Sequence, residues 1–212
     1  MYINAPTENI TVLPNWPRPS DEIVRALAEF PPALIGDVRN RMDMMSAEIR
    51  CLTPGIRLAG AVLPIQVWEG DNLGIHRGLD EAKPGDVLVV SANSVTNRSV
   101  FGGILAEICQ SKGIRGVIID GAVRDIEEMT AMGIAVFARG VVPAGPSKNG
   151  PGAVGKPVAC GNVVCNPGDI VIGDQDGIVV VPLSEAGGTL QRLPLQADLE
   201  RQILARVKAA AQ

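Results

Sequence analysis

Apolar and polar segments alternate most regularly between residues 87 and 137. Three apolar runs, typical of strands, are separated by two segments with one apolar face, typical of helices; in chain order they cover 87–93, 102–112, 115–120, 125–132 and 134–137. This succession of strand, helix, strand, helix and strand predicts two βαβ units with parallel strands and right-handed crossovers. Because the strands are almost entirely apolar, we expect both faces of the sheet to be covered.

The segment before residue 87 predicts three helices and a strand. Ser20 is a typical N-cap, and two acids follow it in the first turn, where the helix dipole favours negative charge. The expected elements are a helix after Ser20 that is stopped by Pro31 and Pro32, a helix over 33–42, a strand over 54–68 and a helix over 72–79.

The segment after residue 137 predicts a loop, short strands and a final helix. Residues 140–156 are rich in Gly, Pro, Lys and Asn, and loops of this length inside a domain are usually functional or part of an interface. The sequence DQDG at 174–177 lies between two apolar runs and predicts a β-hairpin. A helix is expected from Glu185, with its buried side at Leu190, Leu193, Leu199, Ile203 and Val207.

Length and composition favour one globular domain. A chain of 212 residues predicts a single domain, here over residues 20–212, preceded by a proline-containing extended arm over residues 1–19. The content of 46% hydrophobic and 20% charged residues excludes disorder as the main state. The net charge of −4 and the aromatic content of 3% argue against nucleic-acid binding, which needs a basic face or stacking aromatic rings.

Composition also argues against several kinds of site and location. His76 is the only histidine, which excludes a His-rich zinc site. The four cysteines match no zinc or redox spacing, and we expect Cys109 and Cys160 in the core. No apolar stretch approaches the roughly 18 residues of a membrane span, and the N-terminus does not resemble a signal peptide. We therefore expect a cytoplasmic protein with no membrane contact.

Two catalytic motifs are considered and rejected. The sequence GPGAVGK at 150–156 has the spacing of a phosphate-binding loop, but Pro157 stands where Ser or Thr would hold the metal. A Ser-His-Asp hydrolase would need His76 as its base, yet the chain contains no GxSxG elbow. We expect residues 150–156 to form a mobile loop and His76 to be a packed or surface residue.

The strongest candidate site lies at two strand-to-helix junctions, where ligands bind in α/β sheets. Arg124 and Asp125 follow one strand; the Asp can hold a divalent metal, and the Arg can bind a carboxylate through two parallel hydrogen bonds. Gly102 and Gly103 precede the other helix and let backbone amides approach an anion. The alternative is that Arg124 pairs with Glu128 on the surface and that Asp125 only caps its helix.

The same region carries a family resemblance. The segment GGILAEICQSKGIRGVIIDGAVRD at 102–125, with PGDVLVV, NPGDIVIGDQDGIVVVP and the GD of LIGDVRN, resembles the family that joins 4-hydroxy-4-methyl-2-oxoglutarate aldolases with the regulator of ribonuclease activity A, the RraA-like family. The similarity covers residues 20 to 205. It implies a compact α/β fold of the swivelling β/β/α type with βαβ units and a C-terminal helix. It also implies a homotrimer or homohexamer with the active site at a subunit boundary.

The resemblance further implies a reaction and the residues that perform it. The protein would be a metal-dependent pyruvate aldolase in which Asp125 binds Mg²⁺ or Mn²⁺ and Arg124 binds the pyruvyl moiety. The substrate carboxylate would be held by the backbone amides of Gly102, Gly103, Ile104 and Leu105. The substrate would be a 4-hydroxy-2-oxo acid such as 4-hydroxy-4-methyl-2-oxoglutarate, cleaved to release pyruvate. Oxaloacetate decarboxylation is an expected side activity because it forms the same enolate.

Two features keep other functions open. Bacterial aldolases similar to this chain tend to carry Asp at the position of Gly103, whereas other members carry Gly there and acidic residues after the Arg-Asp pair. Glu128 fits this second pattern, but the next residue is Met129 rather than an acid. Relatives that resemble the ribonuclease regulator bind and inhibit a large enzyme, and a related lyase on another oxo acid would use the same site. The retained Arg124-Asp125 pair favours an enzyme, because a surface inhibitor needs no metal ligand beside two glycines.

Overall fold

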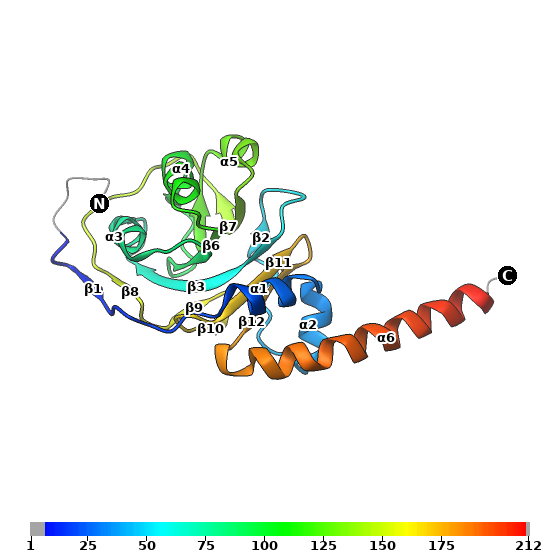
Figure 1. Ribbon diagram of the computed structural model, residues 1–212. Coiled ribbons are helices and arrows are strands. Elements are labelled where there is room, and N and C mark those ends of the chain that lie inside the picture. Colours follow the sequence, from blue (N-terminus) through cyan, green and yellow to red (C-terminus); the bar gives the residue numbers. More distant parts are fainter. Residues whose placement is uncertain (1–6, 211–212) are drawn as a thin grey trace.

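The computed structural model describes residues 7–210 and shows an α/β domain with a long C-terminal helix (Figure 1). The first six residues of the expected N-terminal arm lie outside the described residues. The central path of the main sheet contains, in spatial order, β1 (Ile10–Val12), β8 (Gly152–Val154), β3 (Leu58–Val67), β4 (Asp86–Ser91), β6 (Gly116–Val123), β7 (Ala135–Val141) and β2 (Arg50–Cys51). Three more strands belong to the main sheet: β5 (Ser99–Phe101), which pairs with β6, and the hairpin of β11 (Ile170–Asp174) and β12 (Gly177–Val181), in which β11 pairs with β3. A separate sheet is formed by β9 (Val158–Cys160) and β10 (Val163–Cys165).

The parallel centre of the sheet is the part that the sequence predicts best. β3, β4, β6 and β7 are parallel neighbours, as expected for successive βαβ units. The connecting helices are α3 (Leu73–Glu81), α4 (Gly103–Ser111) and α5 (Ile126–Met132). Every residue of β4 and β6 is buried, in agreement with their apolar sequences.

Both faces of the sheet are covered, also as predicted. The helices α3, α4 and α5 lie on one face, and α1 (Asp21–Ala28), α2 (Pro32–Val38) and the C-terminal strands lie on the other (Figure 1). Alternate residues of β4 point to opposite sides: Leu88 and Val90 join the core under α3 and α4, whereas Val87 and Val89 join a second core that includes residues of β9 to β12.

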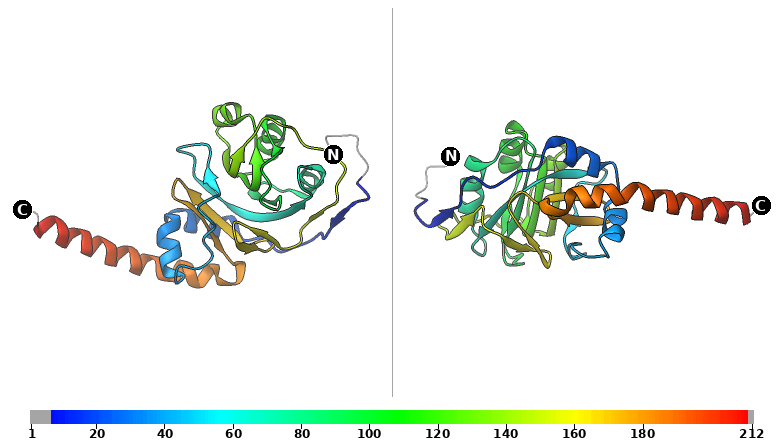
Figure 2. Two further views of the ribbon diagram at one scale, coloured as in Figure 1. Left: turned by 180° about the vertical axis from the view of Figure 1, so that it is seen from behind. Right: turned by 60° about the horizontal axis from the view of Figure 1, so that its bottom comes forward.

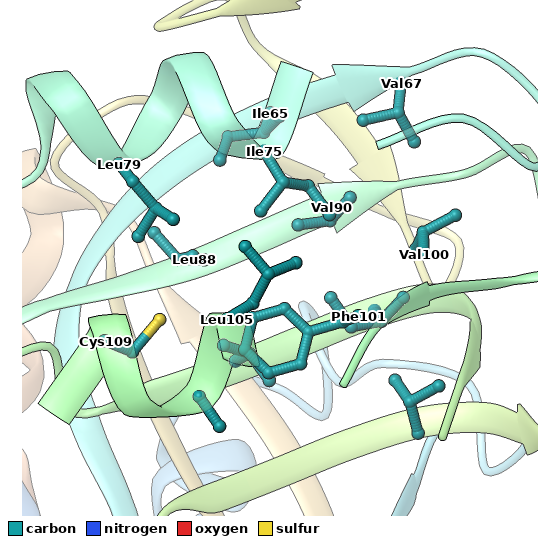
Figure 3. Close-up of a cluster of buried hydrophobic side chains, with 14 of the residues drawn as sticks. Ile65, Val67, Ile75, Leu79, Leu88, Val90, Val100, Phe101, Leu105 and Cys109 are labelled. Carbon is teal, nitrogen blue, oxygen red and sulfur yellow. The ribbon is translucent and has the colours of Figure 1, made fainter. Parts of the chain in front are cut away.

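The first of these cores fixes the position of two helices that begin at the candidate site. Ile75 and Leu79 of α3 and Leu105 of α4 pack around Leu88 and neighbouring residues of the sheet, and all of them are buried (Figure 3). Cys109, also in this core, and Cys160, in the second, are buried free thiols, as expected. Because the core holds α3 and α4 against the sheet, the first turns of both helices are placed at its edge.

Several element boundaries differ from the prediction. Pro32 begins α2 instead of ending the preceding helix, because its ring is tolerated in a first helical turn. The same helix ends at Val38 rather than residue 42, and Asn40 and Arg41 take positive φ values that a right-handed helix does not allow. The Ser20 N-cap is confirmed, since its side chain accepts a hydrogen bond from the Ile23 amide.

The strands at the site are longer than predicted. β6 includes Gly121–Val123, which the sequence assigns to a loop, and β7 continues to Val141. After a register shift, Ala122 and Val123 pair with Gly140 and Val141 of β7, and this second set of pairs extends both strands beyond their apolar runs. The expected loop at 140–156 contains β8, and the predicted hairpin at DQDG is confirmed by β11 and β12.

The C-terminal helix α6 (Ala186–Ala210) confirms one prediction and contradicts another. Its first half packs on the domain, with Leu193 buried and Leu190 half-buried. Leu199, Ile203 and Val207, expected to be buried, are exposed, because this half of the helix extends away from the domain body (Figures 1 and 2). No helix within residues 7–210 is both long and apolar enough to cross a membrane.

Candidate active site

The carboxyl ends of the parallel strands bring four chain segments together, as expected for a ligand site in an α/β sheet. These are the segment after β3, which holds Asn72 and His76, and the segment from β5 into α4, which holds Gly102 to Leu105. The others are Arg124 and Asp125 after β6 and Lys148 after β7. Residues from all four line one pocket of about 140 Å³. Its full lining consists of Asn72, His76, Ser99, Val100, Phe101, Gly102, Ile104, Leu105, Arg124, Asp125, Pro146 and Lys148.

The carboxylate of Asp125 is turned away from its own helix and toward α4. Asp125 occupies the N-cap position of α5 in the left-handed conformation, with φ of 62°, and its side chain makes no capping hydrogen bond. Instead its Oδ2 atom accepts a hydrogen bond of 3.0 Å from the amide of Gly103. A non-glycine residue held at positive φ stores strain that is common at functional sites. The interpretation of Asp125 as a simple helix cap therefore does not fit.

The guanidinium of Arg124 lies beside this carboxylate between two glycines. Arg124 Nε is 3.4 Å from Asp125 Oδ2, and the two side chains are 40% and 39% exposed. A Cβ atom placed at Gly145 would lie 2.9 Å from Arg124 Nη1, and one at Gly102 would lie 3.0 Å from its Cγ. Larger residues at either glycine would displace the arginine. Within residues 7–210 no ion pair joins Arg124 to Glu128, so that alternative is not observed.

Glu128 reaches back over Gly103. A Cβ atom placed at Gly103 would lie 2.6 Å from Glu128 Cδ, and one at Gly102 would lie 2.6 Å from Asp125 Oδ2. The absence of side chains at these two positions thus makes room for two carboxylates, one from each end of the first turn of α5. Glu128 thus brings its carboxylate to the space above Gly103.

The first turn of α4 offers backbone amides to the same place. The Gly103 amide is bound by Asp125, and the Ala106 amide is bound by the Gly102 carbonyl. The amides of Ile104 and Leu105 lie in the first helical turn, where no helical carbonyl can accept them. Of the predicted amides that belong to α4, those of Ile104 and Leu105 therefore remain available to an anion.

The same pocket is also lined by Asn72, His76 and Lys148, of which the sequence brings only His76 into consideration, as a rejected catalytic base. Asn72 and His76 are 5% and 4% exposed, and the buried atoms Asn72 Oδ1 and His76 Nδ1 have no hydrogen-bond partner. Burial, followed by the charge of Lys148, lowers the pKa of His76 to about 4, so the imidazole is neutral at pH 7. The signal for Asn72 and Lys148 is their place just after strands of the parallel sheet, which becomes visible only once those strands are assigned.

A larger cleft of about 540 Å³ lies at the opposite edge of the sheet. Its lining includes Gly85, Asp86 and Arg115, which lie at the amino ends of β4 and β6. Because ligand sites in such sheets occur at the carboxyl ends of the strands, we place the active site in the smaller pocket. The motif GPGAVGK is part of neither a phosphate loop nor a helix start, since its centre forms β8.

Comparison with known proteins identifies the family of this chain. The family model for RraA-like proteins, described as Aldolase/RraA, matches residues 21–180. The chain belongs to the RraA-like family. Its curated RraA-like relatives include a protein of Halalkalibacterium halodurans, provisionally named as a 4-hydroxy-4-methyl-2-oxoglutarate aldolase, that is 32% identical over 84% of this chain and 86% of its own length. The 4-hydroxy-4-methyl-2-oxoglutarate aldolase of Thermus thermophilus is 34% identical over 62% of this chain and 79% of its own length.

Solved structures of RraA-like proteins share the fold. RraAS2 of Streptomyces coelicolor, described as an unusual member of the family of ribonuclease inhibitors, has a TM-score of 0.80 and 28% identity, covering 88% of this chain and 98% of that one. The RNA-processing inhibitor RraA of Thermus thermophilus has a TM-score of 0.67 and 28% identity, covering 72% and 93%. The family thus includes proteins named as aldolases and proteins named as inhibitors.

Proposed function

We propose that this protein is a divalent-metal-dependent lyase that cleaves a 4-hydroxy-2-oxo acid, such as 4-hydroxy-4-methyl-2-oxoglutarate, and releases pyruvate. The observation that carries the proposal is the orientation of the Asp125 carboxylate. It does not cap its own helix but accepts a hydrogen bond from the Gly103 amide in the first turn of α4, beside the Arg124 guanidinium. Relatives named as aldolases support the reaction class. A protein that acted only as a surface inhibitor would not need this strained arrangement in a pocket.

The residues at the site fit a hard divalent cation. Asp125 and Glu128 bring two carboxylates to the space above Gly102 and Gly103. No cluster of three or more His, Cys, Asp and Glu side chains suited to a metal occurs in the described part of the chain. Mg²⁺ is commonly bound by one or two carboxylates with water and substrate completing the shell, and Mn²⁺ accepts the same oxygen ligands. We therefore propose Asp125 as the direct ligand and Glu128 as a second carboxylate.

The remaining residues would bind the pyruvyl half of the substrate. A divalent ion held by Asp125 and Glu128 would supply Lewis-acid stabilisation of the negative charge that develops on the keto oxygen when the C3–C4 bond breaks. The Arg124 guanidinium donates hydrogen bonds to the keto oxygen and to a carboxylate oxygen, and it adds positive charge where the enolate forms. The amides of Ile104 and Leu105 bind the other carboxylate oxygen. Oxaloacetate yields the same enolate on loss of CO₂, so its decarboxylation is a proposed second activity.

We also propose that the protein is a homo-oligomer, a trimer or hexamer. The second half of α6 exposes Leu199, Ile203 and Val207 away from the domain body, and exposed apolar residues on a projecting helix favour contact with another chain. Light scattering at micromolar concentration should give at least the mass of a trimer. A monomer mass would contradict this proposal.

A second candidate function is inhibition of a ribonuclease. The structural neighbour of Thermus thermophilus named as an RNA-processing inhibitor favours it. The test that separates the two functions is pyruvate release from a panel of 4-hydroxy-2-oxo acids and oxaloacetate, measured with Mg²⁺ and with excess EDTA. Chelator-sensitive pyruvate release supports the lyase. Absence of release from every compound would contradict it and leave the inhibitor as the better proposal.

A further inference from the structure

We propose that the cleft of about 540 Å³ at the amino ends of β4 and β6 binds an aliphatic phosphate ester, a ligand with a phosphate at one end and an apolar chain at the other. This cleft is called the amino-end cleft below. It shares no lining residue with the active pocket, so the proposal does not depend on the proposed lyase activity. Its volume lies within the range of roughly 300–1,000 Å³ that is usual for small-molecule sites.

The lining of the amino-end cleft carries more positive than negative charge. It contains four arginines and two aspartates, in a chain whose net charge is −4. Arg18 and Asp86 neutralise each other through two hydrogen bonds, of 2.8 and 2.9 Å. Three arginines then remain against Asp21, which leaves an excess of two positive charges; these arginines are Arg25, Arg57 and Arg115. A phosphate monoester, with about two negative charges at pH 7, balances this excess, whereas a single carboxylate does not.

The three arginines come from separate segments of the chain, and most of their hydrogen-bond donors are free. Arg25 Nε donates to the Asp21 carbonyl at 3.2 Å. Arg57 Nη2 donates to the Phe30 carbonyl at 3.2 Å. No carboxylate among residues 7–210 pairs with either of them, and the Arg115 guanidinium has no partner in that range. Each guanidinium has five N–H donors in a planar fork that matches the oxygens of a phosphate, so the three together can bind one.

The segments that carry these arginines are held in place by other contacts. Arg18 Cζ lies 4.7 Å from the centre of the Trp16 ring, and its ion pair with the buried Asp86 joins the chain before α1 to the start of β4. The Asp86 carbonyl accepts a hydrogen bond of 2.9 Å from the Arg115 amide, which fixes the backbone of Arg115 beside this pair. The helix α1, which carries Arg25, lies against β3 (Figure 1). Because these segments are ordered before a ligand binds, the entropic cost of binding is lower.

The apolar part of the lining favours an aliphatic chain on the ligand. It includes Val24 and Ala28 of α1, Ala59 and Ala61 of β3 and Ile172 of β11. None of the described residues that line the cleft is aromatic, so the cleft offers no stacking surface for a nucleotide base. Aliphatic side chains stabilise a bound alkyl chain in proportion to the apolar area that is removed from water. An alkyl phosphate therefore fits the lining better than a nucleotide or inorganic phosphate does.

The test is calorimetric titration of the protein with octyl phosphate, kept below the concentration at which it forms micelles. Divalent metal is left out, so that no ion in the active pocket attracts the phosphate. We expect octyl phosphate to bind, and we expect inorganic phosphate and octanoate to bind at least about tenfold more weakly. Inorganic phosphate lacks the apolar chain, and octanoate carries only one negative charge.

Exposed arginines supply the variants and a matched control. Arg115→Met should weaken the binding of octyl phosphate about tenfold, and Arg115→Glu should weaken it further, because a charge-assisted contact is first lost and then made repulsive. Arg57→Met should show a loss similar to that of Arg115→Met. Arg192→Met replaces an exposed arginine of α6 that lines neither pocket, and it should bind as wild type does. Arg124→Ala changes only the active pocket, so it should also bind octyl phosphate as wild type does.

Three results would overturn the proposal. The first is no binding of octyl phosphate by wild type, and the second is equal binding of octyl phosphate and octanoate. The third is loss of binding in Arg124→Ala with none in Arg115→Met and Arg57→Met, which would place the ligand in the active pocket. Pyruvate release is measured separately: an inactive protein that binds octyl phosphate as expected contradicts the lyase and leaves the amino-end cleft as a phosphate-ester site.

Discussion

Replacing Arg124 by lysine separates a role in substrate binding from a role in stability. The substitution keeps the positive charge but removes the planar group that donates two parallel hydrogen bonds. In the structure Arg124 is 40% exposed and contacts Asp125 through Nε at 3.4 Å. An ion pair this open to solvent contributes at most about 1 kcal/mol to folding. We therefore expect the melting temperature of Arg124→Lys to stay close to that of wild type.

The expected effect on catalysis is much larger. Loss of a two-pronged contact to a carboxylate and a developing enolate should cost on the order of 3 kcal/mol, which is roughly a hundredfold in kcat/KM. The Arg124 side chain lies between Gly102 and Gly145, which leave room for the planar guanidinium. A lysine ammonium has a single nitrogen, so it would not donate from the two guanidinium nitrogens that contact the substrate at once. Arg124→Ala should be at least as impaired as Arg124→Lys.

The assay is pyruvate release with saturating Mg²⁺, measured beside a thermal melt for both variants. Arg77→Lys is a matched control, because Arg77 forms its ion pairs with Asp80 and Glu81 on the surface of α3 and does not line the pocket. Near-normal kcat/KM together with a lowered melting temperature in Arg124→Lys would show that Arg124 is structural, and it would refute the placement of the site.

Three further predictions follow from single contacts. Gly103→Ala places a methyl group against the flexible end of Glu128, so the stability of the protein should change little. The Mg²⁺ concentration for half-maximal activity should rise several-fold. An unchanged Mg²⁺ requirement would show that Glu128 is not needed. Burial and the charge of Lys148 hold the pKa of His76 near 4 in the folded protein, against 6.5 in the unfolded chain. The free energy of unfolding should therefore fall by at most about 3 kcal/mol through this residue as the pH drops from about 6.5 to 4. Urea unfolding of His76→Gln should show a smaller loss of stability over this pH range than that of wild type. Asp71→Ala removes the hydrogen bonds that fix residues 147 and 149, so hydrogen exchange of the Asn149 amide should become faster. Exchange of the β4 amides should stay unchanged. Equal protection of the Asn149 amide in wild type and in Asp71→Ala would argue against this anchoring role.

The parallel sheet was predictable because its strands carry their signal locally. Runs such as VLVVSAN and RGVIID are almost entirely apolar, and the amphipathic segments between them have helical spacing, so two βαβ units follow from the sequence alone. The same units place Gly102 and Asp125 at the carboxyl edge of the sheet. The contact between Asp125 and the Gly103 amide could not be predicted, because it joins residues 22 positions apart and depends on a positive φ at Asp125.

Other features depend on surroundings that a single sequence does not contain. The apolar positions Leu199 and Ile203 have helical spacing and were expected to be buried, but spacing does not show whether the body of the domain extends that far. Asn72 and Lys148 carry no local motif, and they meet only because β3 and β7 end at the same edge of the sheet. For the same reason Gly121–Val123 was assigned to a loop, although pairing with β7 and β5 keeps it in the sheet.

The most direct test of the proposed lyase is the Mg²⁺ dependence of pyruvate release by wild type and by Asp125→Asn. The amide keeps the size of the side chain but removes the charge that would hold the ion. We predict that wild type releases pyruvate from 4-hydroxy-4-methyl-2-oxoglutarate with saturable Mg²⁺ dependence and loses this activity in excess EDTA. Folded Asp125→Asn should have less than about one hundredth of the wild-type kcat/KM at any Mg²⁺ concentration. Full activity of Asp125→Asn, or of wild type in excess EDTA, would contradict the account.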